Sequence, residues 1–301
     1  MKTYPYKNLV FKGGGVKGIA YVGALKALET ANILPQITRF AGTSAGAITA
    51  ALAACRISSD ALNTFLSTTN YNNFKDKGGV FNFLNDLANH FGAYEGDYFL
   101  DDWFKVFLSK QGVDPEITFK GVNDKFGTTL KVFSTDLNLQ QVQVFSFETT
   151  PNVKIAEAVR ASMSIPMFFR AWQFPDGDPN DHIYVDGGVM YNYPVDTFDS
   201  VDSPEATLGF FLTDLNPDDH KPNDLAFGIS HLELYIKSVF ESLMNSQDVM
   251  VNENEFDESR TVRVDDLGIS ATDFGITQDQ AKQLYDSGYK ATNDFLKAKN
   301  I

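Results

Sequence analysis

The sequence predicts an α/β protein with a mainly parallel sheet flanked by helices. Two strand–turn–helix units follow one another near the start of the chain. Residues 8–11 form a short apolar segment that leads through a glycine-rich turn into a helical segment over 19–30. Residues 39–41 lead in the same way into a second glycine turn and a helical segment over 47–54. Tandem units of this kind pair their strands in parallel and place helices on the faces of the sheet.

The rest of the chain continues with strands and helices. Residues 58–112 have a mainly helical pattern that is rich in aromatic side chains, which is typical of a helical subdomain or of a cap over a site. Because no Pro/Ser-rich linker divides the chain, we expect a single domain over 1–301, with a mostly helical cap region at 58–112. Further strands are predicted at 129–134, 141–147, 183–185, 206–212 and 261–264, and helices at 153–162, 224–251 and 277–297, the last of which starts at a capping box.

The composition is that of an acidic globular protein. Its 25 basic and 39 acidic residues give a net charge of −14, which repels nucleic acid and provides no general attraction to anionic lipid. We therefore expect no nucleic-acid partner, and we expect peripheral membrane contact to come from a local patch, exposed apolar residues or a partner protein. Cys55 is the single cysteine, so no intrachain disulfide forms, and its apolar helical surroundings predict a buried, inert thiol in a reducing compartment.

No segment of the sequence has the pattern of a secretory signal or of a membrane span. Residues 1–7 lack a long apolar stretch, and no run approaches the roughly 20 apolar residues that cross a bilayer. We expect a soluble, cytoplasmic protein that is at most peripheral to membranes. A bacterial effector exported without a cleaved signal would have the same features.

The turn Gly42-Thr43-Ser44-Ala45-Gly46 has the pattern of a nucleophilic serine between a strand and a helix. Such a turn is sharp, and glycines two residues before and after the serine remove the Cβ atoms that would clash. The turn would place the Ser44 hydroxyl at the N-terminus of a helix, where developing negative charge is favoured. Gly-x-Ser-x-Gly also arises by chance in a chain with 22 glycines.

A glycine loop, Gly13-Gly14-Gly15-Val16-Lys17-Gly18, follows the first predicted strand. Successive glycines can aim two backbone N–H groups at an oxyanion with no side chain in the way. The same spacing fits the dinucleotide-binding fingerprint, which also requires an acidic residue at the end of the second strand to hold the ribose. Here the second strand ends in Gly42-Thr43-Ser44 instead, and this disfavours the dinucleotide interpretation.

The third motif, Asp186-Gly187-Gly188, lies at the end of an apolar strand, where a side chain can project into a site at the sheet edge. An isolated Asp-Gly is more often a β-turn. This one follows the two other glycine motifs in a fixed order, and Asn192-Tyr193-Pro194 comes soon after it.

Together, the three motifs resemble the patatin-like phospholipase family. That family is marked by a Gly-Gly-Gly-x-Arg/Lys-Gly oxyanion loop, a Gly-x-Ser-x-Gly nucleophile and an Asp-Gly-Gly/Ala base motif. The similarity covers roughly residues 8–290. Further matches are Arg160-Ala161-Ser162 with Ser164-Ile165-Pro166, Asn192 and Pro194 after the base motif, and Asp273-Phe274, Leu284, Gly288 and Tyr289 near the C-terminal end.

The resemblance implies a three-layer α/β/α fold and a Ser–Asp dyad without a catalytic histidine. It makes Ser44 the nucleophile and Asp186 the base. The Gly14 and Gly15 amides would form the oxyanion hole, with Gly13 and Lys17 beside them as substrate-binding residues. Many members have arginine at the position of Lys17, and lysine lacks the planar fork with which arginine would bind a headgroup phosphate.

The four histidines do not form a recognisable triad. His182 is four residues before Asp186 beside the turn-rich segment 174–181, and we interpret it as a solvated surface residue rather than the base of an orthodox triad. An ordinary aspartate is a weak base, so we expect burial to raise the pKa of Asp186. No cofactor or metal is implied, because no clustered His/Cys ligands and no EF-hand loop occur.

The expected activity is hydrolysis of the carboxylic ester bonds of phospholipids, of phospholipase A type, through an acyl-enzyme. Neutral lipid or glycolipid esters are alternative substrates, and an unidentified activator or a second copy of the chain is a further expected partner. Two other classes stay open: a lipid-binding or regulatory module that has lost catalysis, and a dinucleotide-binding oxidoreductase.

Overall fold

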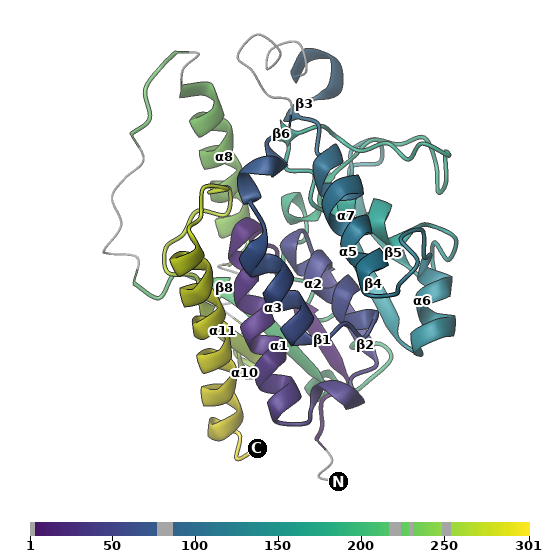
Figure 1. Ribbon diagram of the computed structural model, residues 1–301, viewed down its shortest axis with the longest axis vertical. Helices are drawn as coiled ribbons and strands as arrows, with labels where there is room; N and C mark the ends of the chain where they lie inside the picture. Colours follow the sequence, from purple (N-terminus) through teal and green to yellow (C-terminus); the bar gives the residue numbers. More distant parts are fainter. Residues whose placement is uncertain (1–3, 77–86, 217–223, 229–230, 249–253) are drawn as a thin grey trace.

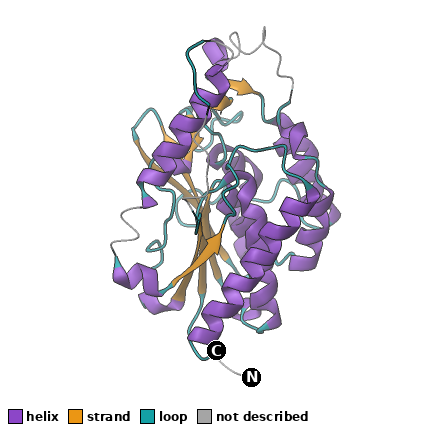
Figure 2. Ribbon diagram, turned by 90° about the vertical axis from the view of Figure 1, so that its left-hand side faces the viewer, coloured by secondary structure: helices purple, strands orange, loops and turns teal. Residues whose placement is uncertain are grey.

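The computed structural model of the chain describes residues 4–76, 87–216, 224–228, 231–248 and 254–301. Seven of its strands form one sheet in the order β5-β4-β2-β1-β8-β9, with β7 also paired to β4 (Figures 1 and 2). The strands are β1 Asn8–Phe11, β2 Arg39–Thr43, β3 Gly92–Tyr94, β4 Thr129–Asp136, β5 Gln141–Ser146, β6 Met167–Phe169, β7 Tyr184–Asp186, β8 Thr207–Thr213 and β9 Thr261–Asp265.

Helices surround this sheet, and short 3₁₀ or π turns connect several of them. The α-helices are α1 Ala20–Thr30, α2 Ala45–Ala54, α3 Ser59–Thr68, α5 Lys105–Lys110, α6 Phe119–Phe126, α7 Ile155–Ser162, α8 Leu232–Ser246, α10 Glu255–Ser259 and α11 Gln278–Ala298. The 3₁₀ segments are η1 Gly15–Ile19, η2 Leu34–Gln36, η3 Tyr71–Phe74, η5 Gly187–Val189 and η6 Pro204–Ala206, and η4 Tyr98–Phe104 is a π-helix. Among the described residues, no helix has both the length and the apolar character needed to cross a membrane.

The predicted α/β class is confirmed. Strand β1 is apolar apart from Asn8 and buried along its whole length, which fits a central strand covered on both faces. It pairs in parallel with β2 on one edge and with β8 on the other. The helices α1, α2, α7 and α11 pack with the large core on one face, whereas a smaller core joins strand residues such as Val10 and Phe133 to the segment after β7 on the other.

The pairing of β4 positions the site. One edge of β4 pairs with β2 over residues 129–133 in parallel and then with β7 over residues 134–136 in the antiparallel direction. The other edge is occupied by β5. Strands β2 and β7 lie end to end along this edge of β4 and run in opposite directions. Their C-terminal ends therefore meet. Ser44 directly follows β2 and Asp186 is the last residue of β7, so this pairing brings the two motifs together.

Helices α1 and α11 pack in very close contact. Gly23 of α1 faces the backbone of Tyr285, and Gly288 of α11 faces the backbone of Ala20. A Cβ atom at either glycine would overlap a carbonyl oxygen of the opposing helix. The predicted capping box of α11 is confirmed, since Thr277 and Gln280 make both of its hydrogen bonds.

Two predictions of secondary structure were wrong in part. Residues 224–228 are not helical, and α8 begins only at Leu232, after Gly228 with its positive φ of 129°. The predicted end of this helix lies outside the described residues. The small parallel sheet of β3 and β6 was not predicted, because a strand of three residues gives too short an alternation to stand out from its helical surroundings.

The region 58–112 contains α3, η3, β3, η4 and α5 in its described part. Its aromatic residues Tyr71, Phe74, Phe99 and Trp103 are buried. Gly78, Gly79, Phe81 and Phe83 of this region lie outside the described residues, as does His220, one of the four histidines of the chain. The assignment of this region as a cap, and of the chain as a single domain, stays a prediction.

Candidate active site

Ser44 lies in a strained turn between β2 and α2. Its backbone angles, φ 53° and ψ −123°, are unusual for a residue with a side chain. The two flanking glycines permit this geometry: a Cβ atom at Gly42 would overlap the Gly46 carbonyl, and one at Gly46 would overlap the Phe11 carbonyl. The Gly-x-Ser-x-Gly spacing is therefore required by close backbone contacts.

The Ser44 hydroxyl is paired with one carboxylate. Its Oγ donates to Asp186 Oδ2 at 2.7 Å, although the two residues are 142 positions apart. Ser44 is 3% exposed and Asp186 is fully buried. The two side chains predicted to act together are thus in hydrogen-bonding contact.

Ser162 holds the backbone of the serine turn. Its Oγ accepts the Ser44 N–H at 2.8 Å and donates to the Phe133 carbonyl of β4 at 2.5 Å. In the sequence, Ser162 stands out only as part of the Arg160-Ala161-Ser162 match. Its contact depends on α7 packing against β4, which local sequence does not reveal.

The Asp186 carboxylate is desolvated and held by few donors. Burial raises its pKa from 3.8 to about 7, while hydrogen bonds from the Ser44 hydroxyl and the Gly188 N–H act in the opposite direction. The Gly188 N–H donates to Oδ1 at 2.8 Å, so each carboxylate oxygen has one donor. Gly187 is required at the next position, because a Cβ atom there would overlap the Phe133 carbonyl. A carboxyl group with a pKa near neutrality is suited to accept a proton at physiological pH.

The glycine loop runs from the end of β1 into η1, beside Ser44. The Gly13 N–H donates to the Asn192 carbonyl at 3.0 Å, whereas no backbone hydrogen bond among the described residues uses the N–H of Gly14 or Gly15. Gly15 has a φ of +57°, and a Cβ atom there would overlap the Ala271 carbonyl. The loop therefore offers two adjacent amides close to Ser44.

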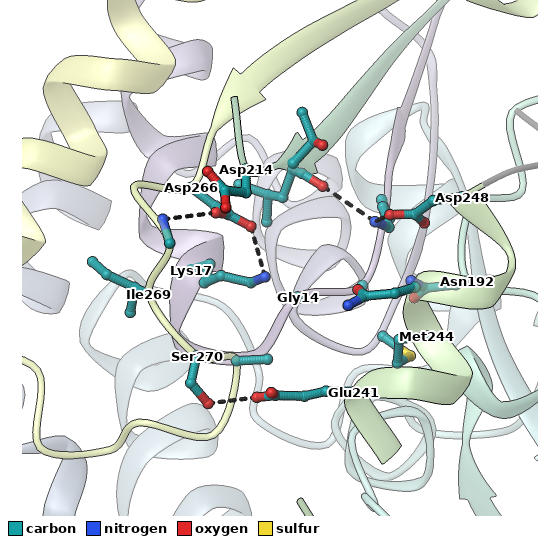
Figure 3. Close-up of a pocket in the computed structure, with 17 residues that line it drawn as sticks. Gly14, Lys17, Asn192, Asp214, Glu241, Met244, Asp248, Asp266, Ile269 and Ser270 are labelled. Atoms are coloured by element: carbon teal, nitrogen blue, oxygen red, sulfur yellow. Dashed lines mark hydrogen bonds and ion pairs between the residues drawn. The ribbon is translucent and has the colours of Figure 1, made fainter. Parts of the chain in front are cut away.

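The Lys17 ammonium group forms an ion pair and does not present an unpaired charge to Ser44. Its Nζ lies 2.7 Å from Asp266 Oδ2, and both side chains are largely buried. The neighbouring Lys12, which belongs to none of the three motifs, is paired in the same way with Asp248 at 2.7 Å. Both ion pairs line a polar cavity of about 750 Å³ beside the glycine loop (Figure 3).

An apolar pocket lies on the other side of the loop and includes Ser44. Gly15 and Gly18 contribute to its wall, and its remaining lining is almost entirely aliphatic and aromatic. Several of these side chains come from the region 58–112, including Leu66, Phe99 and Trp103. The pocket volume is about 70 Å³.

His182 is bonded elsewhere. Its Nδ1 lies 2.7 Å from Asp136 Oδ2 at the end of β4. The hydrogen bond between Ser44 and Asp186 involves no histidine among the described residues. His182 is thus outside the dyad, but it is half-buried against a buried carboxylate rather than solvated as predicted.

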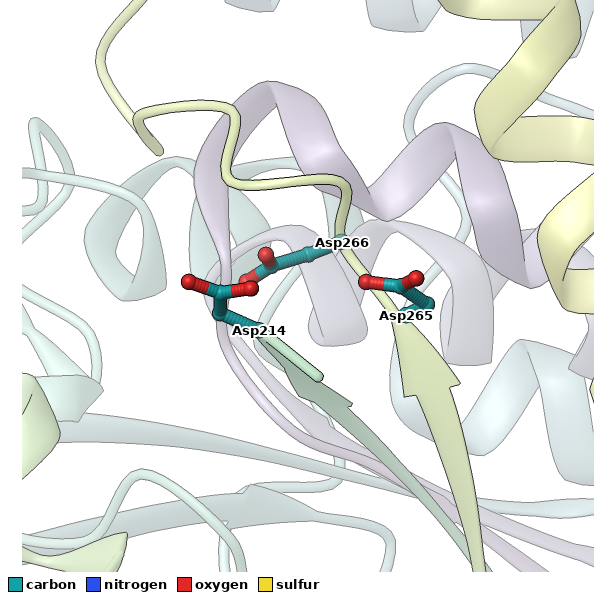
Figure 4. A group of neighbouring side chains, drawn as sticks. All are labelled: Asp214, Asp265 and Asp266. Carbon is teal, nitrogen blue, oxygen red and sulfur yellow. The ribbon is translucent and has the colours of Figure 1, made fainter. Parts of the chain in front are cut away.

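Three carboxylates lie close together at the ends of β8 and β9. Asp214, Asp265 and Asp266 each offer an oxygen, and these oxygens lie within 4.8 Å of one another (Figure 4). The Lys17 ammonium group already supplies positive charge to Asp266. Acidic residues grouped in this way commonly occur without a metal ion, and no further observation favours one here.

Comparison with known families distinguishes between the two interpretations of the glycine loop. The profile of the patatin-like phospholipase family matches residues 9–199, which include all three motifs. This chain belongs to the patatin-like phospholipase family. Family membership supports lipid hydrolase activity for the chain.

Relatives with known sequences extend over most of the chain. An uncharacterized protein of Bacillus subtilis, YqhO, is 29% identical over 304 residues, covering 97% of this chain and 98% of its own length. A probable lipid hydrolase of Invertebrate iridescent virus 6 is 28% identical over 196 residues, covering 65% of this chain and 64% of its own length.

The fold is also that of a solved bacterial protein. The crystal structure of VipD from Legionella pneumophila matches 98% of this chain and 67% of its own chain, with a TM-score of 0.67 and 17% identity. At this level of identity the likeness concerns the fold alone.

Proposed function

We propose that this member of the patatin-like phospholipase family is a serine-dependent acyl hydrolase of phospholipase A type, and that it cleaves the carboxylic ester bonds of phospholipids. The observation that carries the proposal is the 2.7 Å hydrogen bond from the Ser44 hydroxyl to the buried Asp186 carboxylate, at the wall of an apolar pocket. The raised pKa of Asp186 supports a role for this residue as the base.

In the first half of the reaction, Asp186 takes the hydroxyl proton as Ser44 Oγ attacks the ester carbonyl carbon. The carbonyl oxygen becomes an oxyanion, which the N–H groups of Gly14 and Gly15 would stabilise. The bond between the carbonyl carbon and the alcohol oxygen then breaks, and the alcohol leaves with the proton from Asp186. The acyl group stays on Ser44 as an ester.

In the second half, water takes the place of the alcohol. Asp186 accepts a proton from water as the water oxygen attacks the acyl-enzyme, and the same proton returns to Ser44 when the fatty acid leaves. No second base is required, because one carboxylate receives and returns one proton in each half of the reaction.

The apolar pocket supports a fatty acyl group as the part of the substrate that Ser44 attacks. A fatty acyl chain is stabilised by leaving water, at roughly 25 cal/mol per Å² of apolar surface. The pocket is lined by side chains such as Ile48, Phe74 and Phe274. In this structure it is narrow, so a long chain would require the aromatic side chains to rotate or the pocket to extend.

A catalytically silent lipid-binding module is the second candidate. It would keep the apolar pocket but have no need for a strained serine in contact with a desolvated carboxylate. A dinucleotide-binding oxidoreductase is less well supported, because the neighbouring strand β2 ends at Thr43 and is followed by Ser44 rather than by an acidic residue.

Incubation of a mixed lipid extract with the wild-type protein, Ser44→Ala and Asp186→Asn, followed by mass spectrometry of lipids and fatty acids, tests the proposal. We expect free fatty acids and lysophospholipids with the wild type and neither product with the two variants. Unchanged lipids in all three samples would favour the silent module, and full activity in Asp186→Asn would exclude the dyad.

A further inference from the structure

The glycine loop separates two cavities of opposite character. Gly15 and Gly18 face the apolar pocket that contains Ser44. Gly13 and Gly14 face the polar cavity of about 750 Å³ (Figure 3). An ester held at Ser44 has two parts, an acyl chain and an alcohol, and the two cavities match this difference in polarity.

The polar cavity is close to the nucleophile, because Gly13 lines the cavity and lies beside Ser44. A Cβ atom built on Gly13 would lie 3.4 Å from Ser44 Cβ and 3.2 Å from Met244 Cε, and it would overlap Asn192 Oδ1. Asn192 and Met244 both line the polar cavity. The alcohol part of a bound ester would therefore reach the cavity by passing Gly13.

Asn192 is a buried polar side chain without a partner at this position. It is 1% exposed, and neither its Oδ1 nor its Nδ2 has a hydrogen-bond partner among the described residues. A buried amide in this state is costly unless a ligand or water satisfies it. Its place in the lining makes it available to a hydroxyl or phosphate oxygen of a ligand in the cavity.

The charges around the cavity do not favour an anion. Its charged lining residues in the described part of the chain are Lys12, Lys17, Asp214, Glu241, Asp248 and Asp266. The ammonium groups of Lys12 and Lys17 are already paired with Asp248 and Asp266, with Nζ–Oδ2 distances of 2.7 Å each. The Glu241 carboxylate, by contrast, accepts from the hydroxyls of Ser270 and Thr272, which leave its negative charge in place.

From these observations we propose that the polar cavity binds the headgroup of the lipid substrate, and that Glu241 makes it select headgroups without net negative charge. Zwitterionic headgroups, in which an ammonium group would face Glu241 and a phosphate oxygen would face Asn192, are the class that fits best. This inference rests on the proposed hydrolase activity and adds a substrate preference to it.

The test compares two phospholipids with identical acyl chains, phosphatidylcholine and phosphatidylglycerol, each diluted in nonionic detergent micelles. The ratio of their hydrolysis rates is measured for the wild type, Glu241→Lys and Glu148→Lys. Glu148 is exposed after β5 and is not among the cavity residues, so its variant changes the net charge equally without altering the cavity. Using a ratio cancels any general loss of activity.

We expect the wild type to prefer phosphatidylcholine, and Glu241→Lys to shift the ratio toward phosphatidylglycerol by about 10-fold or more, since a charge reversal near a buried ligand is weakly screened. Glu148→Lys should keep the wild-type ratio. If Glu241→Lys does not fold, as judged by thermal melting, the pair Glu241→Gln and Glu148→Gln carries the same comparison, with a shift of about 3-fold.

Equal ratios in the Glu241 and Glu148 variants would overturn the headgroup assignment while leaving the hydrolase proposal intact. A failure of the hydrolase proposal itself has a different signature: the wild type would then release no fatty acid from either lipid beyond the Ser44→Ala level.

Discussion

At the scale of single residues, Asp186 shows a conflict between stability and chemistry. Its carboxylate is fully buried, and among the residues that the structure describes only the Ser44 hydroxyl and the Gly188 N–H donate to it. Burial penalises the charged form, so the pKa rises to about 7. The proposed base is thus made stronger at the expense of the folded state.

The pH dependence of turnover follows from this pKa. Asp186 accepts a proton only when it is ionised, so kcat/KM for a soluble 4-nitrophenyl ester should rise with pH and level off above an apparent pKa near 7. Initial rates between pH 5 and pH 9 measure this. A rate that stays flat over this range would contradict the assignment of Asp186 as the base.

The same residue predicts a variant that is inactive but more stable. In the folded protein Asp186 keeps its proton up to about pH 7, whereas in the unfolded chain the group ionises near its ordinary value of 3.8. The folded protein therefore loses stability as the pH rises from about 4 to 7. Asp186→Asn removes this loss, so it should exceed the wild type in unfolding free energy at pH 8 by about 2–4 kcal/mol.

Urea denaturation of both proteins at pH 8 and at pH 4.5 tests this. The advantage of Asp186→Asn should shrink at the lower pH, where Asp186 is protonated in the folded state. An Asp186→Asn protein that is less stable than the wild type at pH 8 would show that the hydrogen bonds to the carboxylate outweigh its burial.

The sequence predicted the two central side chains but not the contacts that Ser162 and Asn192 make near them. Ser44 and Asp186 lie in motifs whose glycines are required by close backbone contacts. Both residues could therefore be identified from the sequence. Ser162 and Asn192 approach the site through the packing of α7 and of the segment after β7. Their roles depend on contacts between distant segments, which spacing alone does not encode.

At the scale of elements, β4 determines how the site forms. Its edge is shared by β2 and β7, which run in opposite directions and end at the same place. The sequence predicted both strands, but the antiparallel pairing of a three-residue strand has no local signal. The long helix predicted over 224–251 was given too early a start, since α8 begins at Leu232.

The contact between α1 and α11 predicts a change in unfolding free energy that is opposite in sign to the change expected from helix propensity. Replacing a mid-helix glycine by alanine normally stabilises a helix by about 1 kcal/mol. Gly288→Ala should instead lower the unfolding free energy by about 1–3 kcal/mol, because the new methyl group would overlap the Ala20 carbonyl. Chemical denaturation measures the difference, with Lys290→Ala on the exposed side of α11 as the control.

A stability of Gly288→Ala equal to or above that of the wild type would mean that the two helices separate at little cost. In that case the close packing of α1 on α11 would not contribute to holding η1 and the glycine loop in place.

At the scale of the whole molecule, the net charge of −14 opposes approach to anionic membranes. Salt screens this repulsion, with a Debye length that falls from about 30 Å at 0.01 M to about 8 Å at 0.15 M. Hydrolysis of vesicles rich in phosphatidylglycerol should therefore increase several-fold over this range of salt. Vesicles of phosphatidylcholine alone should show little change, and an equal response of both would contradict the prediction.

The central claim concerns the reactivity of one serine, and reaction with a fluorophosphonate tests it most directly. Peptide mapping by mass spectrometry should place the adduct on Ser44 in the wild-type protein. Asp186→Asn should react at least about 100-fold more slowly, as expected when a general base is removed. An adduct on another serine, or equal rates in the two proteins, would contradict the account.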